Sequence, residues 1–257
     1  MFIDSHCHID FPELAEQEEA MLENMRESQV THALCVSVNL KDWQRVHALA
    51  ARHDNLFASV GVHPDHPAET TEVSEMDLLT RAERPRVVAI GETGLDYYRA
   101  TGDLEWQRDR FRTHIRAAKT CVKPLIIHTR AAAGDTIAIM AEEDAGAVGG
   151  VMHCFTESWE VAKAALDLGF YISFSGIITF KNASDIREVV RQVPLERLLI
   201  ETDSPYLAPV PHRGKLNQPA YVKHVAECVS AIKNVPVEVI AEMTSRNFFL
   251  LFRDALS

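Results

Sequence analysis

Residues 2–13 read FIDSHCHIDFPE, a strand-like run that leads directly into the start of a helix. The run up to His8 is short and begins with the apolar, strand-favouring pair Phe2 and Ile3, which is typical of a β-strand. Asp10, Pro12 and Glu13 then match a helix N-cap, a first-turn proline and a capping-box glutamate. The segment therefore predicts one β-then-α unit, with its helix over 13–28.

The same unit recurs along the 257 residues. Eight strand-like runs alternate with amphipathic stretches, and we find neither a Gly/Ser linker nor a break in composition. The runs end near His8, Val38, His63, Glu92, His128, His153, Phe174 and Asp203. The further helices are predicted over 41–53, 74–82, 103–121, 135–144, 157–168, 183–192, 219–232 and 237–253. This alternation predicts an α/β fold, a (β/α)8 TIM barrel, as a single domain over residues 1–257.

A doubly wound sheet is the rival architecture. The first predicted strand is followed by neither G-x-G-x-x-G nor G-x-x-x-x-G-K, the phosphate-binding motifs expected there. The count of eight strands also proceeds without an interrupting second domain. Both observations favour the barrel.

The composition limits the class of protein. With 47% hydrophobic and 25% charged residues, the chain has the balance of a globular protein. The formal net charge is −11, which argues against a broad basic surface for nucleic acid but allows a local phosphate site. We find no signal-like start and no run of about 20 apolar residues. We therefore expect a cytoplasmic protein with no membrane partner. A monomer is expected, with an oligomer left open.

The five cysteines are scattered and lack C-x-x-C pairing, which is typical of reduced thiols rather than disulfides or a zinc finger. Cys154 is expected on the strand face opposite His153, as a bystander. Glu201 is expected one layer below Asp203, where it could orient a ligand histidine.

Metal-ligand residue types occupy the predicted carboxyl ends of five strands. That end of a barrel carries the active site, and residues two apart on a strand, such as His6 and His8, project to the same side. Singly, each histidine could be an ordinary core residue and each carboxylate a loop or cap residue. Together they predict a metal centre. The predicted ligands are His6, His8, Glu92, His128, His153 and Asp203.

Six ligands exceed the needs of one catalytic ion, so the sequence predicts two divalent cations, Zn, Mn or Mg. A plausible arrangement puts His6, His8 and Asp203 on one ion, His128 and His153 on the other, and Glu92 between them. The predicted reaction is hydrolysis by a metal-bound hydroxide, with Glu92 and Asp203 as catalytic residues and Asp203 also able to take the proton.

Several motifs follow one another in a characteristic order. They are His6-Cys7-His8-Ile9-Asp10, Gly61-Val62-His63-Pro64, Gly91-Glu92-Thr93-Gly94-Leu95-Asp96-Tyr97, His128-Thr129-Arg130, His153-Cys154-Phe155, Ser175-Gly176, Glu201-Thr202-Asp203-Ser204-Pro205-Tyr206-Leu207 and Pro211-His212-Arg213-Gly214-Lys215. From Phe2 to about Phe252, the chain resembles the TatD family of metal-dependent hydrolases, and within it the bacterial YcfH-type branch.

The resemblance implies an amidohydrolase-like barrel with two divalent metals and deoxyribonuclease activity, often as a 3′→5′ exonuclease on single strands. The family's ligand positions fall on the same six residues. A related group carries a carbamylated lysine where this chain has Glu92, so that group is disfavoured. One departure is Ala131, which stands where relatives commonly have an acidic residue after H-x-R.

Five further residues are candidates for substrate binding. Arg130 could clamp a phosphate, and His63 could contact substrate or donate a proton. The loop after the eighth strand contributes Arg213 and Lys215, against the global sign of charge. Tyr206 could stack on a base. The alternative for each of these side chains is a solvated or packing residue of the rim.

The leading hypothesis is a DNase acting on single-stranded or frayed ends, because the acidic surface leaves no long basic groove for duplex. A second hypothesis is an ester or amide hydrolase, such as an aminoacyl-tRNA deacylase, since the same chemistry attacks carbonyl carbon. A third, without catalysis, is a metal-sequestering or scaffold protein with a coordinatively closed site.

Overall fold

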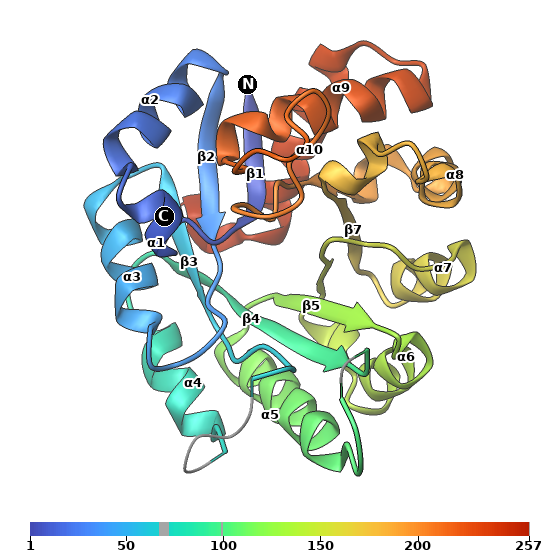
Figure 1. Ribbon diagram of the computed structural model, residues 1–257. Helices are drawn as coiled ribbons and strands as arrows, with labels where there is room; N and C mark the ends of the chain where they lie inside the picture. The colour runs from blue at the N-terminus through green and yellow to red at the C-terminus, as the bar shows by residue number, and fades with distance from the viewer. Residues whose placement is uncertain (67–71, 99, 257) are drawn as a thin grey trace.

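The computed structural model describes residues 1–66, 72–98 and 100–256. Within these residues, eight parallel strands form one sheet in the order β1 to β8. The backbone N–H of Asp203 donates to the His6 carbonyl at 2.9 Å, and that of His8 to the Ser204 carbonyl at 2.7 Å. These bonds bring β1 beside the segment after β8, so the barrel is nearly closed. Figure 1 shows the helices around the outside of the strands.

The strands are β1 (Phe2–Cys7), β2 (Val30–Cys35), β3 (Leu56–Val60), β4 (Val87–Asp96), β5 (Leu125–Arg130), β6 (Gly150–Met152), β7 (Tyr171–Phe174) and β8 (Leu198–Ile200). The α-helices are α1 (Pro12–Ala15), α2 (Glu18–Glu27), α3 (Trp43–Arg52), α4 (Glu75–Ala82), α5 (Glu105–Cys121), α6 (Ala133–Glu142), α7 (Trp159–Asp167), α8 (Ser184–Gln192), α9 (Val222–Lys233) and α10 (Val237–Leu251). Short 3₁₀ turns are η1 (Ala145–Ala147), η2 (Gly176–Thr179), η3 (Leu195–Arg197), η4 (Pro219–Tyr221) and η5 (Arg253–Leu256). The predicted (β/α)8 barrel is confirmed.

The barrel has an inner and an outer apolar layer, because successive strand side chains point to opposite faces. The inner cluster includes Val88, Ile126 and Val151, and it continues onto Phe248 and Phe252 at the end of α10. In α10, the Asn247 side chain donates to the Leu198 carbonyl, at the start of β8. Helix α10 therefore packs at the amino-terminal end of the barrel and leaves the carboxyl ends of the strands for function.

The first predicted helix is divided. One helix was expected over 13–28, but α1 ends at Ala15 and α2 begins at Glu18. The predicted N-cap at Asp10 is wrong: Phe11 occupies that position and makes no side-chain cap bond. The Asp10 carboxylate is buried and accepts instead from the Cys35 thiol at 3.6 Å. Only the first-turn proline of the predicted start is present.

Several strands also end before their predicted last residue. β1, β2, β3, β6 and β8 end one to three residues short, whereas β4 and β5 run beyond Glu92 and His128. Of the six predicted ligands, His8, His153 and Asp203 thus follow their strands, whereas His6, Glu92 and His128 lie within them. None of the helices in the described part of the chain is both long and apolar enough to cross a membrane.

Candidate metal centre

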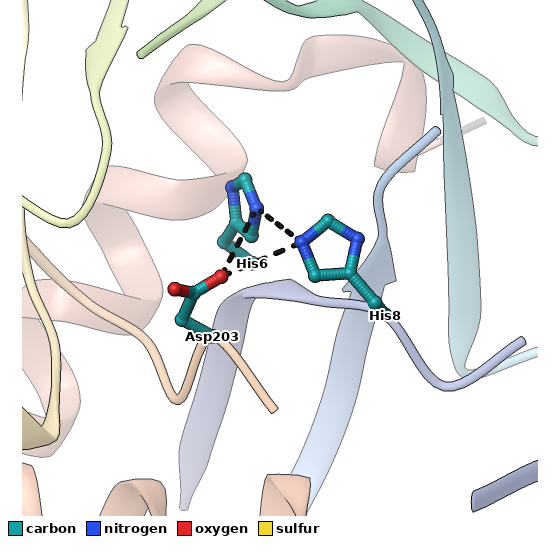
Figure 2. Close-up of side chains that lie close together, drawn as sticks. All are labelled: His6, His8 and Asp203. Atoms are coloured by element: carbon teal, nitrogen blue, oxygen red, sulfur yellow. Dashed lines mark hydrogen bonds and ion pairs between the residues drawn. The ribbon is translucent and has the colours of Figure 1, made fainter. Parts of the chain in front are cut away.

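His6, His8 and Asp203 form one cluster at the seam between β1 and the segment after β8 (Figure 2). The Nε2 atoms of His6 and His8 are 3.2 Å apart. Asp203 Oδ1 lies 3.7 Å from the first and 3.4 Å from the second. Three donor atoms from distant parts of the sequence therefore converge on one point.

The backbone explains why they converge. Cys7 forms a parallel bridge with Ser204, which sets His6 and His8 on either side of the closing contact. Asp203 has a left-handed backbone with φ 56°, a conformation that aspartate tolerates better than most residues. Beneath it, the buried Asp4 carboxylate accepts from the backbone N–H of Thr202 at 2.8 Å and from its hydroxyl at 2.5 Å. This contact holds the two edges of the seam together.

Glu92 stands between two groups of imidazoles. Its Oε2 is 3.5 Å from His6 Nε2 and 3.8 Å from His8 Nε2. Its Oε1 is 2.8 Å from His153 Nε2 and 3.2 Å from His128 Nδ1. One oxygen therefore faces the His6/His8 group and the other faces the second group, in which the His128 and His153 nitrogens are 3.3 Å apart. This is the geometry expected of a carboxylate shared by two cations.

His63 also belongs to the second group. Its Nε2 is 3.3 Å from Glu92 Oε1, and it clusters with Glu92 and His128. The sequence predicts His63 on the rim but not among the metal ligands. Its approach to Glu92 is therefore a finding of the structure. On its other side, Nδ1 is 2.6 Å from Asp65 Oδ1, which fixes the orientation of the ring.

The charges of these groups are strongly coupled. Burial by itself raises the pKa of Glu92, but His153 and His63 hold that pKa well below its usual range. Burial likewise opposes protonation of His63, yet Glu92 and Asp65 raise its pKa to about 10. The Glu92 carboxylate is therefore ionised, and cations and protons compete for the imidazoles around it.

Two carboxylates support the histidines from behind. Asp96 Oδ2 is 3.1 Å from His128 Nε2, and Glu201 Oε1 is 3.4 Å from His153 Nδ1. Glu201 also accepts from the backbone N–H of Cys154 at 2.7 Å. The sequence predicts that Glu201 orients a ligand histidine, but it makes no such prediction for Asp96. A signal for Asp96 was present, since it lies four residues beyond Glu92 on the same strand.

A cavity of about 940 Å³ opens above these groups. Arg130 and Tyr206 line it, with Arg130 lying over the Tyr98 ring at 3.8 Å. Trp106, which sequence analysis missed, lines it from α5. Arg213 lies in a separate hollow over the Phe180 ring, and neither Arg213 nor Lys215 is among the described residues lining the main cavity.

Cys154 does not lie on the strand face opposite His153, where the sequence predicts it as a bystander. It lines the cavity, and its thiol is 3.2 Å from the Ser175 hydroxyl. The alternation of faces fails here because β6 ends at Met152 and Cys154 has a left-handed backbone with φ 42°. Ala131 is left-handed as well, with φ 54°. Alanine is unusual in that conformation, which Asp and Asn tolerate better.

The donor set fits divalent metal. Four imidazoles and two carboxylates suit Zn, Mn or, less well, Mg. Two ligands each about 2.0–2.1 Å from a tetrahedral ion lie about 3.3 Å apart. The 3.2 Å between the Nε2 atoms of His6 and His8, and the 3.3 Å between His128 and His153, agree with that spacing. The site can therefore hold metal and present it to a substrate in the cavity.

Comparison with known proteins agrees with this chemistry. Residues 3–253 match the family described as TatD related DNase. The chain is 47% identical to the uncharacterized metal-dependent hydrolase YcfH of Escherichia coli K12, over 97% of this chain and 95% of that protein. It is 40% identical to the uncharacterized metal-dependent hydrolase YabD of Bacillus subtilis, over 98% and 99%. The crystal structure of YjjV, a TatD homolog from E. coli K12, superposes with a TM-score of 0.91 at 32% identity, over 98% of both chains. The chain thus belongs to the TatD family of metal-dependent hydrolases.

Proposed function

We propose that this hydrolase cleaves phosphodiester bonds of DNA, as a 3′→5′ exonuclease on single-stranded or frayed ends, with two divalent cations. The observation that carries the proposal is Glu92, whose two oxygens face two separate donor groups. His6, His8 and Asp203 would hold one ion, and His128 and His153 the other, with Glu92 shared. The open cavity above them argues against a coordinatively closed, sequestering site.

Bound cations would supply Lewis-acid polarisation of the scissile phosphate and would lower the pKa of a coordinated water toward neutrality. Asp203 has the position to accept a proton at its carboxylate, since it lines the cavity and its Oδ1 lies 3.4 Å from His8 Nε2. His63 has the position to contact the substrate and to give a proton to the leaving oxygen, because Asp65 orients its ring toward the cavity.

The rim favours an unpaired strand. Tyr98 is 60% exposed and Tyr206 is 55% exposed, so both rings can stack on bases. Arg130, stacked on Tyr98, is the cavity's candidate phosphate contact. The net charge of −11 repels the phosphates of a long DNA duplex. The expected substrate is therefore a short single-stranded end rather than a long DNA duplex.

Arg213 and Lys215 are proposed to contact substrate only beyond the cavity. Arg213 is held by its stacking on Phe180 and by donation to the Ala208 carbonyl at 3.2 Å. Lys215 is exposed in the same loop. A substrate confined to the cavity would not reach either residue, whereas a longer strand could.

The test is turnover of labelled substrates by the full chain supplied with Mn²⁺ or Mg²⁺. A single-stranded DNA labelled at its 5′ end should shorten progressively from its 3′ end, and His153→Ala should abolish the reaction. An aminoacyl-tRNA tested beside it separates the ester-hydrolase alternative. Deacylation without DNA cleavage would overturn the DNase proposal, and the absence of both reactions would favour sequestration.

A further inference from the structure

Two histidines outside the metal centre face each other across the loop that follows β8. His212 lies in that loop and His224 in α9, and their Nε2 atoms are 3.2 Å apart. The spacing equals that of the His6 and His8 Nε2 atoms in the metal centre. It is also the separation expected of two nitrogens on one tetrahedral ion.

The orientation of each ring is set by a second contact. His224 Nδ1 is 2.9 Å from Glu227 Oε2, so Nδ1–H donates to the carboxylate and the Nε2 lone pair is left for a ligand. The His212 ring lies parallel to Tyr221, with centroids 3.8 Å apart and an interplanar angle of 2°. The two Nε2 atoms are therefore aimed at each other by their surroundings.

The charge state also suits a ligand pair. Partial burial, His224 and Lys215 lower the pKa of His212, so its imidazole is neutral near pH 7. Both histidines are partly exposed, so water can reach the remaining coordination positions of an ion.

We propose that His212 and His224 form a second metal site, separate from the Glu92 centre, that takes a borderline transition-metal dication such as Zn²⁺, Ni²⁺ or Cu²⁺. Imidazole suits these ions, whereas Mg²⁺ prefers oxygen ligands and Mn²⁺ stands at the weak end of the affinity order. Glu227 acts as the supporting carboxylate, in the way that Asp96 supports His128 in the main centre.

A bound ion would tie the loop after β8 to α9. The same connection carries Tyr206 and Leu207, which line the main cavity. Its other anchors are the Asn217 amide, which donates to the Thr202 carbonyl at 2.9 Å, and Arg213, which donates to Ala208. The ion would cross-link the outer edge of this loop to α9. The thermal stability of the protein should therefore rise when zinc is added.

The test counts ions in the full chain. Equilibrium dialysis against Zn²⁺, followed by metal analysis, should give one zinc ion fewer per chain for His212→Ala and for His224→Ala than for the unmodified protein. His47→Ala is the matched control, because His47 also stacks on an aromatic ring, that of Trp43 at 4.9 Å, but its Nε2 faces the Pro85 carbonyl oxygen. That control should keep every ion.

Further measurements distinguish the loss of a zinc ligand from misfolding of the variants. Glu227→Gln, which leaves both imidazoles in place, should weaken this zinc ion about tenfold or more. Dialysis against Mg²⁺ should show no difference between the variants and the unmodified protein. Anomalous scattering from zinc-soaked crystals should place an ion between the two Nε2 atoms. Equal zinc content in all folded variants, or no anomalous signal there, would overturn the proposal and leave the pair as a hydrogen bond.

Discussion

Asp96 Oδ2 lies 3.1 Å from His128 Nε2, on the side of the ring opposite Glu92. The His128 Nε2–H can therefore donate to Asp96, which leaves Nδ1 free to face the metal centre. Asp96 is itself fixed, because its backbone exchanges hydrogen bonds with the Gln107 side chain, both at 3.0 Å. Asp96 is thus a positioning residue for a predicted ligand.

Asp96→Asn should weaken metal binding about 10–100-fold while leaving every direct ligand in place. The asparagine can still occupy the space, but it no longer strengthens the donor power of His128. Metal titration of chelated protein measures the effect, and excess metal should restore activity. Asp103→Asn, in the exposed loop after β4, is the control. An unchanged metal affinity in Asp96→Asn would show that Asp96 does not position His128 for metal binding.

Arg110→Gln should lower kcat about 10–100-fold with metal content unchanged. The buried guanidinium donates to the carbonyl oxygens of His63 and His66 and binds the Glu72 carboxylate with two nitrogens, so its loss frees the backbone that carries His63. Arg112→Gln, which breaks ion pairs on the exposed side of α5, is the matched control. If Arg110→Gln reduced metal content instead, Arg110 would support metal binding rather than the placement of His63 for proton transfer.

His114 should make the protein sensitive to acid. Its Nε2 accepts from the Val62 N–H at 3.0 Å, and its Nδ1 donates to the Arg110 carbonyl, so protonation would put two donors against each other. Burial lowers the pKa of His114 to about 4. Because the folded pKa lies below the unfolded value, the contribution to stability is complete above about pH 6.5 and declines as the pH falls toward 4.

The loss attributable to His114 should reach about 3 kcal/mol in the free energy of unfolding. Urea unfolding at pH 7 and pH 4 measures it, with His114→Gln as the reference, because glutamine can accept from Val62 without titrating. The unmodified protein should lose more stability between the two pH values than the variant does. Equal losses would show that His114 does not control the acid response.

Arg130→Ala should raise KM about tenfold or more, since a charge-assisted contact to phosphate is worth about 1.5–3 kcal/mol. The effect should appear both with a chromogenic phosphodiester that fits the cavity and with a long single strand. Lys215→Ala should raise KM for the long strand only. A rise in KM for the small substrate in Lys215→Ala would mean that its loop enters the cavity.

The barrel, and the meeting of the six predicted ligand residues at one rim, could be predicted from the sequence because both depend on local pattern. Each strand is a short apolar run, and the residue after it returns to the same rim of the fold. The sequence predicts His63 at the rim, but the approach of His63 to Glu92 depends on the pairing of β3 with β4. Glu201 was anticipated from its position two residues before Asp203.

Other features depend on tertiary contacts that a single pass along the chain does not show. The N-cap at Asp10 failed because Cys35, from the neighbouring strand, takes its carboxylate. Cys154 turned into the cavity because the chain leaves its strand and adopts a left-handed backbone. His212 and His224 meet only because the loop after β8 folds back on α9.

We propose that two divalent cations, shared through Glu92, carry the hydrolysis of DNA. The most direct test is titration of chelated protein with Mn²⁺, which the His212/His224 pair should bind poorly, while cleavage of a labelled single strand is recorded. Two manganese ions should bind per chain, cleavage should be complete only when both are bound, and Glu92→Gln should lose both effects. Fewer than one ion per chain, or two ions with no cleavage, would contradict it.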